Sequence, residues 1–272
     1  MDLLIDILIV LLVLFLIYIF MVAPKMINRA DRTPFYGRHY AHRGLFDNDS
    51  EAPENSLAAF KKAVDAGYGI ELDVQLSKDN KLVVFHDATL KRMCGVEGKV
   101  WDYTLEELKQ FKLANSNETI PTFEEYLEVV DGKVPFILEY KLDRAQTTVC
   151  QLANEVLKDY KGVYCIESFH PLALLWYRKN RPDVMRGQLC EEFFRNKTYK
   201  GKLLFMILPY LPFNFLTRPD FIAYNHLHAH NISRRVCKTL GALSVAYTIQ
   251  SVEEYEAAKD KFELFIFDSC IL

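Results

Sequence analysis

The chain of 272 residues is half hydrophobic, which is enough for one large core and a short additional segment. Its formal net charge of −3 argues against a nucleic-acid-binding surface, which is usually strongly basic. The six cysteines are scattered without a Cys-x-x-Cys pair, a pattern that fits reduced thiols better than a disulfide framework or a zinc ribbon.

The first predicted element is an apolar helix. Residues 7–23 form an unbroken apolar run, and only Asp6 interrupts its extension back to Leu3. At about 1.5 Å per residue, this helix spans the roughly 30 Å hydrocarbon core of a bilayer. A buried core helix is the alternative, but a helix that is apolar on all faces is typical of a membrane span. A secretory signal peptide would have a basic start and a shorter apolar stretch. Residues 1–24 are therefore predicted to be a transmembrane anchor.

The segment after this helix predicts the orientation of the chain. Residues 25–36 form a short basic linker, and the basic residues nearest the helix all follow it: Lys25, Arg29, Arg32 and Arg38. Because positive charge favours the cytoplasmic side of a membrane, the remaining chain is expected there. The interpretation is a single-pass protein of the cell membrane with one cytoplasmic domain, residues 37–272, and the expected reduced cysteines agree with it.

Strand and helix patterns alternate after the linker. A first strand is expected at 39–43, then a helix at 55–66 and a second strand at 68–76. Residues 77–80 form a turn without a helix, so 81–86 should return as the antiparallel arm of a hairpin.

Six later apolar runs, each preceded by a helical pattern, complete the predicted strands: 134–140, 164–168, 185–189, 221–225, 243–248 and 264–267. Without the return arm of the hairpin this makes eight parallel strands, which predicts an α/β fold, a (β/α)₈ TIM barrel with a β-hairpin after its second strand. An open doubly wound sheet is the alternative, but no glycine-rich phosphate loop follows the first strand.

Charged residues lie at the ends of the first strands. Side chains two apart on a strand share a face, so Glu71 and Asp73 should point the same way. Together with Glu139 they could form an all-oxygen site for Mg²⁺ or Ca²⁺. The alternative is that they are ordinary solvated acids, but acids inside a small barrel would be costly without a cation.

Two histidines and two cations accompany these acids. The hairpin should bring His86 back beside the carboxylates, and His42 ends the first strand, so the histidines are a natural acid–base pair. Arg43 and Lys141 suit a phosphate group. This combination predicts a phosphodiesterase.

Two later segments have more than one interpretation. Residues 203–216 are almost wholly apolar but contain two prolines, so they form either a buried loop under the barrel rim or an apolar lip that enters the membrane. His226, His228 and His230 alternate at the end of the sixth strand, as in a three-histidine zinc site. Because no nearby cysteine accompanies them, a structural role or a place at the substrate rim is preferred.

Five short strings occur in an order and spacing that resembles the glycerophosphodiester phosphodiesterase family: Ala41-His42-Arg43-Gly44, Pro53-Glu54-Asn55, Glu71-Leu72-Asp73-Val74, Phe85-His86-Asp87 and Leu138-Glu139-Tyr140-Lys141. The resemblance extends from about residue 39 to the C-terminus, and Ser168-Phe169 matches a further family position. It implies a barrel fold and metal-dependent hydrolysis of glycerophosphodiesters to glycerol 3-phosphate and an alcohol. It also implies supporting roles for Glu54 and Asn55.

The last third departs from the family pattern. Tyr247-Thr248-Ile249-Gln250 stands where the family often has a Trp-Thr-Val-Asn-like string, and Phe267-Asp268-Ser269 replaces the closing Thr-Asp pair. Two alternatives to the glycerophosphodiesterase therefore stay open. One is a lysophospholipase D that hydrolyses membrane lysophospholipids, and the other is a membrane-tethered barrel that binds phosphodiesters or a partner without turnover. The order of the two histidines, and whether water or an adjacent substrate hydroxyl attacks, are also left open.

Overall fold

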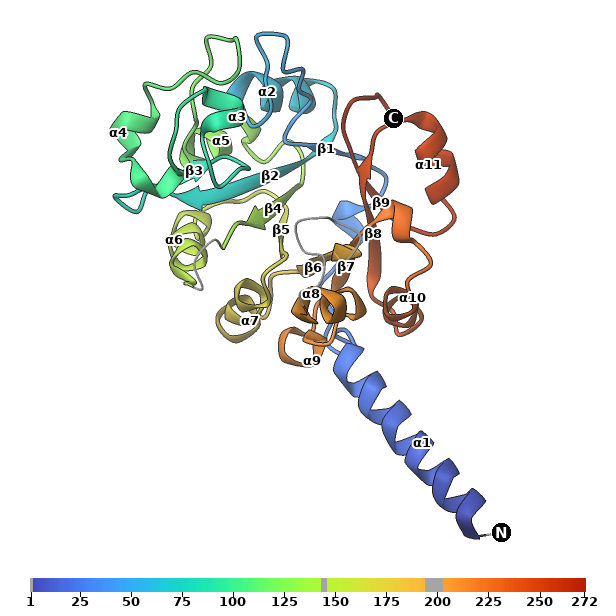
Figure 1. Cartoon of the computed structure of the whole chain (residues 1–272). Coiled ribbons are helices and arrows are strands. Elements are labelled where there is room, and N and C mark those ends of the chain that lie inside the picture. Colours follow the sequence, from blue (N-terminus) through green and yellow to red (C-terminus); the bar gives the residue numbers. More distant parts are fainter. Residues whose placement is uncertain (1, 143–145, 194–202) are drawn as a thin grey trace.

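A closed barrel of eight parallel strands forms the centre of the computed structural model, which describes residues 2–142, 146–193 and 203–272 (Figure 1). Neighbouring strands pair in chain order, and the last strand pairs with the first to close the barrel. The strands are β1 Tyr40–His42, β2 Gly69–Leu76, β4 Phe136–Tyr140, β5 Tyr164–Ser168, β6 Arg186–Cys190, β7 Phe221–Asn225, β8 Leu243–Ile249 and β9 Leu264–Phe267. The TIM barrel predicted from the sequence is confirmed.

The predicted hairpin is also present. Strand β3 Leu82–Val84 runs antiparallel to β2, with Val84 opposite Val74. The next residue, Phe85, donates its N–H to the carbonyl of Asp73 at 3.1 Å. The hairpin thereby brings the chain that carries His86 back to the carboxyl end of β2.

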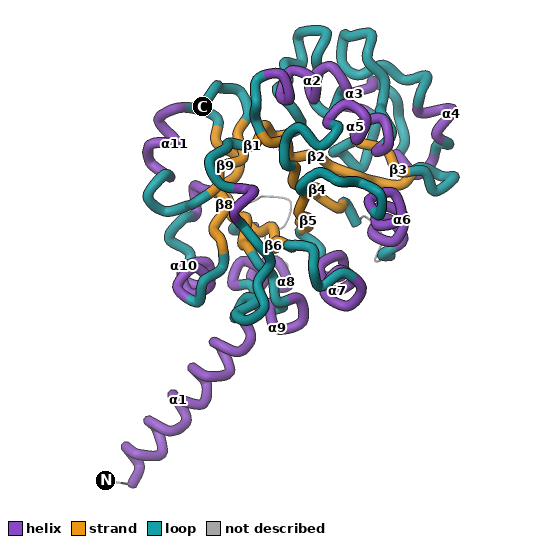
Figure 2. The backbone as a smooth tube through the Cα atoms, turned by 180° about the vertical axis from the view of Figure 1, so that it is seen from behind, coloured by secondary structure: helices purple, strands orange, loops and turns teal. Residues whose placement is uncertain are grey.

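Helices cover the outside of the barrel (Figure 2). The described helices around it are α2 Leu57–Asp65, α3 Lys91–Cys94, α4 Leu105–Leu108, α5 Phe123–Val130, α6 Thr148–Leu157, α7 Pro171–Asn180, α8 Leu203–Ile207, α9 Asn214–Thr217, α10 Ile232–Thr239 and α11 Val252–Ala258. Helix α2 begins two residues later than predicted because Ser56 is its N-cap, with a hydroxyl that accepts the N–H of Ala59.

The barrel interior is apolar at one end and charged at the other. Ile137 on β4 belongs to an apolar cluster inside the barrel, which also includes Tyr40 and Phe221. Phe35, from the segment before β1, packs into the same cluster. Two residues after Ile137 on the same strand face, Glu139 begins the charged layer near the carboxyl ends of the strands, where TIM barrels carry their active sites.

Helix α1 Asp2–Val22 extends away from the barrel as a single exposed rod (Figure 1). Its 20-residue stretch Leu3–Val22 is long and apolar enough to cross a membrane, and only Val22 at its end is buried, whereas a core helix would be buried along its length. Its last turns contact α9 and α10. The Asn214 side chain donates to the carbonyl of Val22 at 2.8 Å, which fixes the end of α1 on the barrel.

The sequence prediction for the three later histidines was wrong in its geometry. His226–His228 is a turn of 3₁₀ helix, so these residues do not alternate along a strand. His226 Nε2 lies 3.5 Å from Glu254 Oε2, and His228 Nε2 lies 3.9 Å from Glu192 Oε2. Among the residues that the structure describes, no metal-ligand cluster includes a histidine.

The apolar run 203–216 is partly buried and partly exposed. It folds into α8, the 3₁₀ turn Leu208–Tyr210 and α9. One side is buried at Pro209 and Leu211, whereas Leu203, Met206 and Tyr210 are exposed. The segment is therefore a packed connection with an apolar outer face, because its two prolines break it into short helices.

Candidate active site

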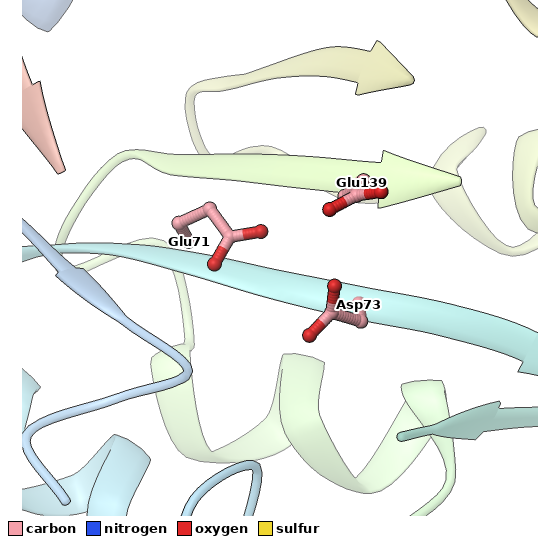
Figure 3. A group of neighbouring side chains, drawn as sticks. All are labelled: Glu71, Asp73 and Glu139. Atoms are coloured by element: carbon pink, nitrogen blue, oxygen red, sulfur yellow. The ribbon is translucent and has the colours of Figure 1, made fainter. Parts of the chain in front are cut away.

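Three carboxylates meet at the carboxyl ends of β2 and β4 (Figure 3). Strand β2 carries Glu71 and Asp73 on one face, and Glu139 of β4 lies in register with Asp73. Each residue offers one carboxylate oxygen, and these three oxygens all lie within 4.8 Å of one another. All three side chains are buried. Burial, followed by the charges of Asp73 and Glu139, raises the pKa of Glu71 well above its usual value.

This carboxylate cluster fits a hard divalent cation. Glu71 Oε2 and Asp73 Oδ1 are buried without a hydrogen-bond partner. Lys141 Nζ lies 2.9 Å from Asp73 Oδ1 without hydrogen-bond geometry, and 2.7 Å from Glu139 Oε2. One ammonium group therefore contacts two of the three carboxylates. Burial opposes ionisation of Asp73, but Lys141 and other nearby cations hold its pKa well below the usual value. A dication with oxygen ligands would satisfy the unpartnered oxygens and offset the remaining repulsion.

Each of the two predicted histidines has a carboxylate on its Nδ1. His42 Nδ1 lies 2.7 Å from Asp268 Oδ2, and His86 Nδ1 lies 2.7 Å from Asp87 Oδ1. His42 Nε2 faces the carboxylate cluster, 3.9 Å from Glu71 Oε2. Burial and the neighbouring Arg43 lower the pKa of His42, although Asp268 acts in the opposite direction. A carboxylate on Nδ1 orients each ring and leaves Nε2 available for proton transfer.

The predicted supporting residues lie behind these groups. Arg43 Nη1 donates to Glu54 Oε1 at 2.7 Å, and its Nε lies 3.5 Å from Asp73 Oδ2. Asn55 Nδ2 donates to the same Asp73 oxygen at 3.0 Å. The tight turn after β1 needs Gly44, since a Cβ there would lie 2.9 Å from the backbone of Ala59. Glu54 thus orients Arg43, and Asn55 orients Asp73.

Four further acidic or basic residues at the site were not assigned from the sequence. Asp87 and Asp268 stood in the quoted strings but were not given the role of orienting the histidines. Glu167 on β5 lies in register with Glu139, is buried, and has an unpartnered Oε2. The sequence around Arg92 on α3 did not indicate its role, because its partner Glu54 is 38 residues away.

Arg92 connects the two halves of the site. Its Nη1 and Nη2 donate to the two Glu54 oxygens at 2.7 Å each, and its Nε donates to Asp87 Oδ2 at 2.7 Å. Glu54 in turn binds Arg43, and Asp87 binds His86. The Arg92 guanidinium therefore holds Arg43 in place through Glu54, and His86 through Asp87.

Replacing Arg92 with glutamine is expected to lower kcat by roughly 10–100-fold, the usual cost of losing an outer partner at a metal site. Divalent-ion affinity should stay near the wild-type value, because Arg92 contacts none of the three clustered carboxylates. Steady-state kinetics and calorimetry with Mg²⁺ measure the two quantities. Lys91→Gln is the matched control, since Lys91 on the same helix pairs with exposed Glu97. A kcat equal to that of the control would contradict the positioning role.

Comparison with known proteins agrees with this geometry. The profile of the Glycerophosphoryl diester phosphodiesterase family matches residues 42–254. A glycerophosphodiester phosphodiesterase of Caldanaerobacter subterraneus subsp. tengcongensis is 35% identical over 163 residues, 56% of this chain and 65% of the relative. A lysophospholipase D of Rattus norvegicus is 31% identical over 151 residues, 51% of this chain and 46% of the relative. The matched regions thus span less than two thirds of these curated relatives.

A solved structure shares the same fold. The glycerophosphodiester phosphodiesterase of Thermotoga maritima superposes with a TM-score of 0.64 at 27% identity, covering 86% of this chain and 96% of that one. The family profile covers most of the chain, including the two histidines and the three clustered carboxylates. The chain therefore belongs to the glycerophosphoryl diester phosphodiesterase family.

Proposed function

We propose that this protein hydrolyses glycerophosphodiesters to glycerol 3-phosphate and an alcohol. One observation carries the proposal: a buried three-carboxylate cluster lies beside a histidine, and a second histidine approaches it on the hairpin, each with its own orienting carboxylate. Family membership and the names of its relatives support it.

Glu71, Asp73 and Glu139 would hold the metal, Mg²⁺ or Ca²⁺. When bound there, the ion would neutralise charge on a non-bridging phosphoryl oxygen. Arg43 and Lys141 would face the same phosphate. Lys141 has three N–H donors and two carboxylate partners, and Arg43 Nε has no hydrogen-bond partner, so both retain capacity for an anion.

His42 and His86 are the proposed acid–base pair. One takes a proton from the attacking hydroxyl, whether of water or of the substrate itself, and the other protonates the leaving alcohol. Asp268 and Asp87 keep the rings oriented and stabilise the imidazolium form that arises during proton transfer. Attack by a substrate hydroxyl would pass through a cyclic phosphate.

A second candidate is lysophospholipase D activity on membrane lipid. It uses the same residues, and two features favour it: the apolar helix α1 and the exposed apolar side chains of α8. The rat relative carries that name. The non-catalytic alternative is disfavoured, because every acid, cation and histidine that the chemistry needs lies in the site.

Assays of the full chain in detergent separate these functions. Glycerophosphocholine and lysophosphatidylcholine are supplied in parallel, each with and without EDTA. The proposal expects EDTA-sensitive release of glycerol 3-phosphate from glycerophosphocholine. Faster turnover of the lysophospholipid would favour the second candidate. No turnover of either substrate with saturating Mg²⁺ or Ca²⁺ would leave only the binding role.

The membrane location is part of the proposal. Helix α1 would anchor the chain in the cell membrane as a single span, with the barrel in the cytoplasm. The basic residues after the span lie against the barrel: Arg29 donates to the carbonyl of Leu240 at 2.7 Å, and Arg38 to that of Gly67 at 3.0 Å. The free thiols of the six cysteines are compatible with a reducing compartment.

A reporter that is active only outside the membrane, fused after Leu272, is expected to show background activity. The reason is the positive charge of the four basic residues that follow the span. A reporter active only in the cytoplasm should give the converse result at the same position. High activity of the external reporter would reverse the proposed topology.

A further inference from the structure

An open cavity of about 690 Å³ lies where α1 joins the barrel, and none of the proposed catalytic residues line it. One wall is apolar and comes from the last turns of α1: Leu16, Ile19 and Phe20. A second wall is basic. The apolar wall suits the acyl chain of a lipid, and the basic wall suits its headgroup.

Four basic side chains line the second wall: Lys25, Arg178, Arg186 and Arg218. One carboxylate, Asp220, lies near two of them, 3.6 Å from Lys25 Nζ and 3.7 Å from Arg186 Nη1. Within the described part of the chain, Arg178 and Arg218 have no ion pair. Burial and the nearby positive charge of Arg178 lower the pKa of Arg218. The wall therefore has excess positive charge that an anion would neutralise.

Arg186 is the most buried of these four basic side chains. It is only 2% exposed, and it lines the cavity. Its Nε donates to the carbonyl of Thr217 and its Nη2 to that of Arg218, both at 2.9 Å. Its Nη1 faces Asp220 Oδ2 at 3.7 Å without a hydrogen bond. The guanidinium is therefore held in place at the wall, where its charge attracts an anion.

The two walls are fixed to each other. Arg218 Nη1 donates to the carbonyls of Phe20 at 3.1 Å and Ala23 at 2.7 Å, and its guanidinium lies 4.9 Å from the Phe20 ring centroid. The ring of Phe20 also lies 5.9 Å from that of Phe215 in α9. The cavity is thus a built feature of the junction between the helix and the barrel.

The depth of the cavity matches a bilayer interface. The apolar stretch of α1 ends at Val22, so the apolar wall lies at the end of the proposed span and the basic wall lies just beyond it. Figure 1 shows α1 leaving the barrel next to α9. Basic pockets at the cytoplasmic end of a membrane helix are suited to anionic lipid headgroups.

We propose that this cavity binds one anionic phospholipid of the surrounding membrane, with an acyl chain along Ile19 and Phe20 and the headgroup phosphate between Arg178 and Arg186. The inference rests on the proposed membrane location of α1 and is independent of the hydrolytic site. A lipid held there would fix the orientation of the barrel relative to the membrane surface.

Native mass spectrometry of the full chain in detergent tests the site, with phosphatidylglycerol titrated against phosphatidylcholine. The wild type should retain one phosphatidylglycerol in preference to phosphatidylcholine. Arg178→Gln should bind phosphatidylglycerol about fivefold more weakly, which corresponds to the roughly 1 kcal/mol that one basic residue contributes at an anionic surface. Arg235→Gln is the matched control, because Arg235 is exposed on α10 and does not line the cavity.

Equal affinity of Arg178→Gln and Arg235→Gln for phosphatidylglycerol would contradict the site, because it would mean that the lipid is attracted non-specifically to the protein surface. Displacement of the lipid by equimolar inorganic phosphate would also overturn it, in favour of a free anion. Thermal unfolding without lipid checks that Arg178→Gln stays folded. Flotation with vesicles tests the membrane anchor separately from the lipid site. All variants should float with the vesicles, because α1 is unchanged in each of them. A wild type that does not float would contradict both the anchor and the site.

Discussion

Replacing Glu71 with glutamine is expected to remove most divalent-ion binding and with it most hydrolytic activity. The loss should exceed the roughly 10–100-fold that the removal of an outer-shell partner costs, because Glu71 is proposed to contact the ion itself. The metal-free protein should stay folded. Its unfolding temperature should not fall, since glutamine keeps the shape of the side chain and cannot carry the negative charge that burial, Asp73 and Glu139 disfavour. The increase in unfolding temperature on adding Mg²⁺ or Ca²⁺ should shrink with the affinity.

Calorimetry with each cation, together with thermal unfolding with and without it, measures these effects. Glu167→Gln is the matched control. Glu167 is also a buried carboxylate and lies in register with Glu139, but it does not belong to the group of three whose oxygens lie within 4.8 Å of one another. Unchanged cation affinity in Glu71→Gln would contradict the three-carboxylate assignment. An equal loss in Glu167→Gln would mean that the cation has a fourth carboxylate ligand.

The barrel could be predicted because its strands carry strong local signals. Most strands are short apolar runs, and the runs are separated by helical patterns with the spacing that a parallel barrel requires. The hairpin was predictable because no helix separates β2 from β3. The alternation of the later histidines was misleading because a local cap decides the conformation. His226 and His228 lie in a 3₁₀ turn and not on an extended strand, because Asn225 caps that turn by accepting the N–H of Leu227.

The site was predictable where one strand presents several residues at once. Glu71 and Asp73 share a face by simple alternation, and Glu139 ends the neighbouring strand. Contacts made by barrel closure were harder to predict from local sequence patterns. Asp268 meets His42 because Ala41 and Phe267 are partners in the pairing of β1 with β9, although 226 residues separate the two side chains. Arg92 was also missed, since its role depends on the contact of α3 with Glu54, which is 38 residues away.

The two histidines should contribute equally to catalysis but unequally to the stability of the fold. His42→Ala and His86→Ala are each expected to lower kcat by roughly 10²–10⁴-fold, the usual contribution of a positioned acid or base. Cation affinity should change little, since neither residue belongs to the carboxylate cluster. His42→Ala should destabilise the fold more, because His42 is more buried and its loss leaves a cavity beside Asp268. The more exposed His86 leaves Asp87 still paired with Arg92.

A pair of substrates distinguishes the roles of the two histidines. Glycerophosphodiesters with a poor alkyl leaving group need a general acid, whereas a p-nitrophenyl ester does not, because p-nitrophenolate leaves without protonation. The variant that lacks the acid should regain much of its rate on the p-nitrophenyl ester, and the variant that lacks the base should not. Near wild-type turnover of the alkyl substrate by either variant would exclude that histidine from proton transfer. Recovery of both variants on the activated ester would mean that neither histidine is needed to activate the nucleophile, and the base would then have to be another group at the site.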